Sequence, residues 1–174
     1  MRRTPFMSAA ALLFIGTTAL AQAQAPAAAT PAKQPNFSGK WTILPDTSPV
    51  RLQGMSPGGG DMGGLAEEAV IVQDDKTIKI TRATPNMGEF TSIFNLDGTE
   101  TFSTVTVQGQ AIPLTLKSRW DGNKFIMSTW ANVGQTIEII MVFSLDATGN
   151  LVTEHTFPDM GNGGGTLTTK YKKN

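Results

Sequence analysis

The fold is decided by residues 112–127, IPLTLKSRWDGNKFIM. Apolar and polar residues alternate along the first part of this stretch, which predicts a β-strand with one apolar face. Asp121-Gly122 is typical of a two-residue turn between antiparallel strands and would place Trp120 opposite Asn123. Phe125 then falls on the same face as Trp120, so the two strands agree on which side points inward. The stretch therefore predicts a β-hairpin with a shared apolar face.

Similar β-rich runs, separated by short groups of turn residues, continue on both sides of this hairpin. None of them carries apolar residues at helical spacing over more than about one turn. The chain from residue 36 onward is therefore predicted to be all-β. The expected strands are residues 37–44, 67–73, 77–82, 89–96, 99–107, 112–120, 123–131, 135–145, 151–157 and 166–172.

The connections between these strands are nearly all short enough to join neighbours, which favours an antiparallel up-and-down meander of about eight to ten strands. An open meander has two unpaired edges, and closing it into a barrel removes them. A barrel is therefore the preferred architecture, and a two-sheet β-sandwich is the alternative.

Residues 1–25 have the pattern of an export signal. Arg2 and Arg3 precede an apolar stretch, and small residues follow at spacings suited to cleavage. The apolar stretch is too short to span a bilayer permanently, so no membrane anchor is expected. Residues 26–35, mostly Ala and Pro, are interpreted as a disordered linker, and residues 36–174 as the barrel domain. We expect the mature protein in the periplasm or secreted.

The amino-acid composition limits the kinds of partner and cofactor that are expected. The chain has no cysteine, so burial of apolar side chains must stabilise the domain without disulfides. It has 14 Lys and Arg against 14 Asp and Glu, so loss of Arg2 and Arg3 leaves a net charge of about −2 and no nucleic-acid partner is expected. His155 is the single histidine, and it is better explained as a structural residue than as a general base or metal ligand. No cofactor is expected.

The two ends of the predicted meander differ, because successive connections alternate between them. One set consists of tight turns built on Asp. The other set is longer and rich in Gly, and it repeats a short pattern at Met62, Met87 and Met160. This predicts a closed end and an open mouth lined by adaptable methionines. The alternatives are that methionine occurs there by chance, or that these residues, with Met55, bind Cu(I) through their thioethers.

Residues 36–41, NFSGKW, resemble the Gly-x-Trp start of the first strand in the calycins, the superfamily of lipocalins and fatty-acid-binding proteins. Residues 118–125, 146–151 and 169–173 are similar to the closing strands of a fatty-acid-binding protein, and equally to small exported bacterial lipocalin-like proteins without an assigned function. The resemblance implies a lipocalin-like barrel with Trp41 at its closed base. In fatty-acid-binding proteins, an Arg-x-Tyr pair in the last strand binds the ligand carboxylate. This sequence departs from that pattern, because Tyr171 matches the Tyr but Thr169 stands in place of the Arg. A fatty-acid ligand is therefore not carried over.

We expect a non-enzymatic barrel that takes up a small hydrophobic or amphipathic molecule through its open mouth, at Met62, Met87 and Met160. Arg82 and His155 are candidate internal polar groups, although an Arg near a strand end often reaches to solvent instead. The alternatives are a structural or inhibitor-like protein-interaction barrel that uses the Gly- and Met-rich loops and has no cavity, and an enzyme with His155 or a buried acid as base. The expected cavity-lining residues are the inward positions Leu114, Leu116, Phe125, Met127, Ile139, Met141 and Tyr171.

Overall fold

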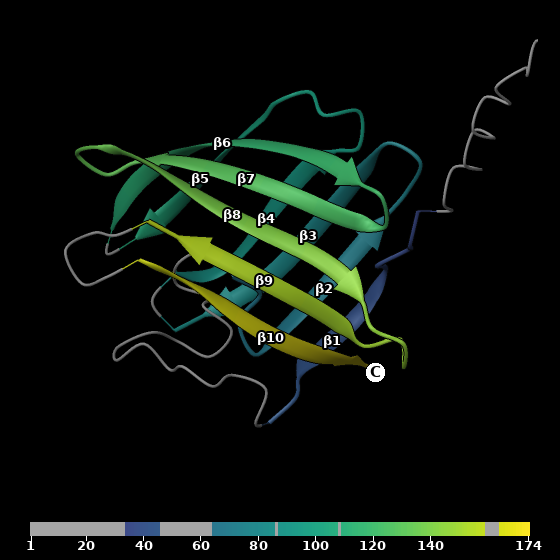
Figure 1. Ribbon diagram of the computed structural model, residues 1–174. Helices are drawn as coiled ribbons and strands as arrows, with labels where there is room; N and C mark the ends of the chain where they lie inside the picture. The colour runs from purple at the N-terminus through teal and green to yellow at the C-terminus, as the bar shows by residue number, and fades with distance from the viewer. Residues whose placement is uncertain (1–33, 46–63, 86, 108, 159–163) are drawn as a thin grey trace, which may run out of the picture. The chain divides into compact units, whose positions relative to one another are not determined.

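The computed structural model describes residues 34–45, 64–85, 87–107, 109–158 and 164–174. They form ten β-strands, each of which begins and ends within two residues of an expected strand (Figure 1). The predicted signal peptide and nearly all of the predicted linker lie outside these ranges, as do Met55, Met62 and Met160. The strands are β1 (Gly39–Ile43), β2 (Glu68–Gln73), β3 (Thr77–Thr84), β4 (Gly88–Asn95), β5 (Thr101–Val107), β6 (Gln110–Asp121), β7 (Lys124–Asn132), β8 (Thr136–Leu145), β9 (Leu151–Phe157) and β10 (Gly165–Lys173).

All ten strands belong to one sheet with the order β4-β3-β2-β1-β10-β9-β8-β7-β6-β5. Each strand pairs antiparallel with the strands next to it in this order, so consecutive strands pair throughout except β4 and β5, and β1 also pairs with β10. In Figure 1, β6 to β10 run across the front while β2 to β4 lie behind them. The predicted up-and-down meander is therefore confirmed as a nearly closed barrel, and the alternative of a two-sheet sandwich is wrong.

The one gap in the sheet is the seam between β4 and β5, which share no backbone ladder in the described part of the chain. Side chains bridge this seam near the turn after β4. The hydroxyl of Ser118 on β6 donates a hydrogen bond to the carbonyl of Asn95 at 2.6 Å. The hydroxyl of Thr101 on β5 donates one to the carbonyl of Ile93 on β4. The barrel is thus closed here by side chains, at the end that carries the Asp turns.

The hairpin predicted for residues 112–127 forms as expected, except for its register. Asp121 pairs with Lys124 and Trp120 pairs with Phe125, so the turn residues are Gly122 and Asn123. The predicted pairing of Trp120 with Asn123 is wrong by two residues. A shift of two positions keeps every side chain on its face, because side chains alternate with a period of two. The predicted inward face is therefore correct despite the wrong register.

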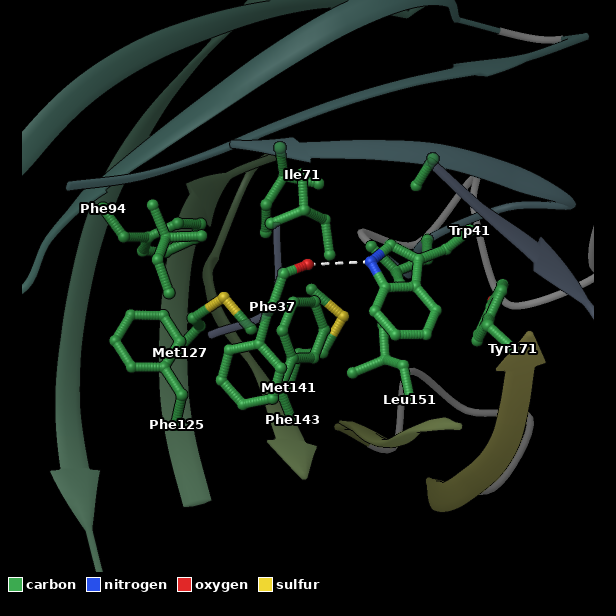
Figure 2. Close-up of a cluster of buried hydrophobic side chains, with 14 of the residues drawn as sticks. Phe37, Trp41, Ile71, Phe94, Phe125, Met127, Met141, Phe143, Leu151 and Tyr171 are labelled. Atoms are coloured by element: carbon green, nitrogen blue, oxygen red, sulfur yellow. Dashed lines mark hydrogen bonds between the residues drawn. The ribbon is translucent and has the colours of Figure 1, made fainter. Parts of the chain in front are cut away.

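A large apolar cluster fills the end with the Asp turns and continues along β1, β2 and β10 (Figure 2). The segment before β1 closes this end: the Phe37 ring stacks on Trp120 with centroids 6.0 Å apart, and the indole N–H of Trp41 donates to the Phe37 carbonyl at 2.8 Å. Burial of these side chains is the main stabilising contribution in a domain without disulfides. The cluster consists of Phe37, Trp41, Leu65, Ala69, Ile71, Ile78, Ile80, Phe94, Leu116, Phe125, Met127, Met141, Phe143, Leu151 and Tyr171.

Asp residues shape three of the tight turns, at Asp74, Asp97 and Asp146. Each carboxylate accepts a hydrogen bond from the backbone N–H two residues further along the chain. These bonds lower the pKa of all three carboxyl groups.

Among the described residues, no helix is long and apolar enough to cross a membrane.

Candidate ligand cavity

The end of the barrel opposite the Asp turns contains a cavity of about 290 Å3 that is partly open to solvent. Its walls come from β3 to β8, and Met87 and Val133 contribute from the connections at this end. Most lining side chains are aliphatic. They include Val105, Val107, Ile112, Leu114, Ile137 and Ile139.

The cavity lies where some of the inward side chains, on β7 and β4, are small. On β7, the inward positions run from Phe125 and Met127 at the packed end to Thr129 and Ala131 at the cavity end. On β4, Phe94 is followed two positions away by Ser92. The barrel has the same ten strands at both ends, so smaller side chains leave part of its interior unfilled. The result is one packed end and one hollow end.

Arg82 on β3 is the one charged side chain among the described residues that line the cavity. It is 7% exposed, and its Nε and Nη1 atoms are buried without a hydrogen-bond partner. Its guanidinium carbon lies 4.2 Å from the centre of the Phe90 ring, a cation–π contact that offsets part of the cost of burial. Desolvation lowers the pKa of Arg82 to about 10, with nearby Tyr171 opposing the shift, so the group stays cationic at neutral pH.

Tyr171 lies in the packed cluster, where it is fully buried. Its hydroxyl donates a hydrogen bond to the carbonyl of Ala66 at 2.9 Å, and this bond connects β10 to the chain two residues before β2. Burial raises the pKa of Tyr171 above its usual value. The phenol is therefore protonated at neutral pH and its proton is engaged with the backbone.

The structure divides the expected lining residues into two groups. Leu114 and Ile139 line the cavity, together with Met87 and Arg82. His155 is 1% exposed and lies on β9, outside the lining of the cavity. Met62 and Met160 lie outside the described residues, so their place relative to the mouth stays a prediction. The other expected lining residues belong to the packed cluster: Leu116, Phe125, Met127, Met141 and Tyr171.

Several lining residues were not among those predicted from the sequence, although the alternation of apolar and polar residues contained the signal for them. Ile112 shares its face with Leu114, Ala131 shares its face with Met127, and Ile137 shares its face with Ile139. Alternation shows which positions point inward. It does not show where along the strands the interior remains unfilled, because that depends on side chains from six strands together.

The described residues contain no group of three or more His, Cys, Asp or Glu side chains placed to hold a metal ion. Of the methionines considered for Cu(I), only Met87 is among them.

No model of a known protein family matches the chain, and no curated protein matches it. The structure by itself defines the class of protein: a ten-stranded, nearly closed up-and-down β-barrel with an apolar cavity at one end. The resemblance of residues 36–41, 118–125, 146–151 and 169–173 to the calycins stays a prediction.

Proposed function

We propose that this protein is an exported, non-enzymatic β-barrel that binds a small hydrophobic or amphipathic molecule in its cavity. The observation that carries the proposal is the hollow end, walled by side chains such as Leu114 and Ile139 and partly open to solvent. Ligand pockets typically measure roughly 300–1,000 Å3 and are lined mainly by apolar groups with a few polar ones. At about 290 Å3, this cavity suits a compact ligand.

The same observation favours ligand binding over a purely structural or protein-interaction barrel, which requires no internal space. The driving force is transfer of the apolar ligand surface out of water, worth about 25 cal/mol per Å2 before the cost of association is subtracted. No catalytic role is proposed for His155, because it lies outside the cavity lining.

The test is a fluorescence titration with N-phenyl-1-naphthylamine, a neutral apolar dye, using protein purified after expression of the full chain. We expect saturable binding to the wild type. Ala131→Phe places a large ring in the cavity and is expected to weaken binding by about tenfold or more. Ala111→Phe adds the same ring at an exposed position of β6 and is the matched control.

Circular dichroism establishes that both variants are folded. Methyl chemical shifts of the wild type with and without dye locate the binding site independently of any substitution. The proposal is overturned if the dye does not bind, or if Ala131→Phe and Ala111→Phe bind it as the wild type does and the methyl groups of Leu114 and Ile139 do not shift.

The export part of the proposal is supported by the pattern of residues 1–25. N-terminal sequencing of protein recovered from the periplasm or medium of an expressing bacterium tests it. We expect a start near residue 22–26. Recovery of the intact chain in the cytoplasm contradicts it.

A further inference from the structure

We propose that the cavity selects ligands with an anionic head group, specifically compact apolar carboxylates, and that Arg82 binds the carboxylate. This inference rests on the proposed function, because it specifies what the same cavity holds.

The Arg82 side chain is buried with hydrogen-bond donors that have no partner. Arginine is seldom buried without an anionic partner, because a guanidinium loses its hydration and its donors must be satisfied. Arg82 is 93% buried, and two of its nitrogen atoms, Nε and Nη1, have no hydrogen-bond partner. The contact with Phe90 stabilises the charge but accepts none of these N–H groups in a conventional hydrogen bond. The side chain therefore has donors without a partner, and Arg82 is one of the residues that line the cavity.

The cavity wall that includes Arg82 holds no anionic side chain among the described residues. The described lining residues include no Asp or Glu, so no carboxylate of the lining neutralises Arg82. The nearby phenol of Tyr171 is uncharged at neutral pH, and its proton is donated to the Ala66 carbonyl. The positive charge of Arg82 is therefore available to pair with an anionic group of a ligand that enters the cavity.

The charge and shape of a carboxylate suit this site better than those of a phosphate. A carboxylate carries a single negative charge, and its two oxygen atoms match two adjacent N–H groups of a guanidinium. The described wall provides a single cationic group, so a dianionic phosphate would keep an uncompensated charge in a desolvated site. The hydroxyls of Ser92 and Thr129 are further donors in the wall. The aliphatic side chains of β5 to β8 then contact the apolar part of the ligand.

The experiment compares two probes of equal chain length, decanoate and 1-decanol, as competitors of N-phenyl-1-naphthylamine. In the wild type, decanoate is expected to displace the dye at a concentration about tenfold lower than 1-decanol, because charge-assisted hydrogen bonds to buried arginine add to apolar burial. Arg82→Gln is expected to remove this preference and leave the affinity for 1-decanol nearly unchanged. Arg82→Lys is expected to keep part of it.

The matched control is Arg119→Gln, since Arg119 is the other arginine among the described residues and is exposed on β6. It removes the same charge from the protein and is expected to leave the preference for decanoate intact. A measurement on the wild type does not depend on variant folding: the nitrogen-15 resonance of Arg82 Nε is expected to shift with decanoate and not with 1-decanol.

The outcomes separate the two proposals. The role of Arg82 is overturned if decanoate and 1-decanol displace the dye equally from the wild type. It is also overturned if the preference for decanoate persists in Arg82→Gln. In both cases the proposal of ligand binding stands. Failure of the dye and of both competitors to bind overturns the proposed function, and this inference with it.

Discussion

Leu116 and Leu114 provide a matched test of the packed and hollow ends of the barrel. They lie two positions apart on the inward face of β6, so they differ in surroundings and not in residue type or strand. Leu116 is 1% exposed and belongs to the packed cluster. Leu114 is partly exposed and lines the cavity. The perturbation is replacement of each by Ala, one at a time.

The expected free energies of unfolding differ because only one substitution creates a new void. Leu→Ala removes three carbon atoms, worth about 2–2.5 kcal/mol when fully buried. At Leu116 the cavity left behind adds to this loss, for a total of about 3–5 kcal/mol. At Leu114 the side chain is partly exposed and the new space joins an existing one, so we expect about 1–1.5 kcal/mol. The difference is about 1.5–4 kcal/mol, or roughly 5–14 °C in Tm for a domain of about 140 residues.

Urea and thermal unfolding followed by circular dichroism measure both values. The affinity for N-phenyl-1-naphthylamine provides a second assay. Leu114→Ala is expected to change this affinity. Leu116→Ala is expected to leave it unchanged at temperatures where the variant is folded. Equal destabilisation by the two substitutions would refute the reasoning. It would mean that both positions are packed alike in solution and that the cavity is closed.

Three further predictions concern single contacts. Tyr171→Phe removes the hydrogen bond to the Ala66 carbonyl and leaves that buried acceptor unsatisfied, so unfolding should require about 1–3 kcal/mol less in a urea titration. Ser118→Ala removes the hydrogen bond to the Asn95 carbonyl at the seam between β4 and β5. Relative to the wild type, this substitution is expected to speed amide hydrogen exchange more in β4 than in β8. The hydroxyl of Thr148, with backbone N–H groups, holds the pKa of Asp146 at about 2. Thr148→Val should therefore raise it, as followed by the carboxyl carbon-13 shift.

The sign of the pH effect follows from the direction of this last shift. The pKa of Asp146 is lower in the folded chain than its usual value of 3.8, so its contribution to stability is present above that value and is lost as the pH falls to about 2. Thr148→Val should make stability fall less steeply across this interval. An unchanged carboxyl titration would contradict the prediction. Unchanged stability of Tyr171→Phe, or uniform exchange after Ser118→Ala, would contradict the other two.

The sequence by itself determined the strands, the up-and-down meander and the inward face of the hairpin formed by residues 112–127. Alternation is a local property with a period of two, and Asp- and Gly-containing turns fix where each strand ends, so both can be read along the chain. The hairpin at Asp121 illustrates the strength of this signal, because its predicted register was wrong by two residues and the inward face was still correct. The short connections then left few topologies other than a meander.

Only the tertiary structure decided which inward residues pack and which surround a cavity. Leu114 and Leu116 look equivalent in the sequence, yet one lines the cavity and the other is packed. The burial of Arg82 without a partner for two of its nitrogen atoms is likewise invisible in the sequence around it. The physical reason is that unfilled volume and unmet hydrogen bonds depend on the sum of side chains from distant strands, which meet only when the barrel closes.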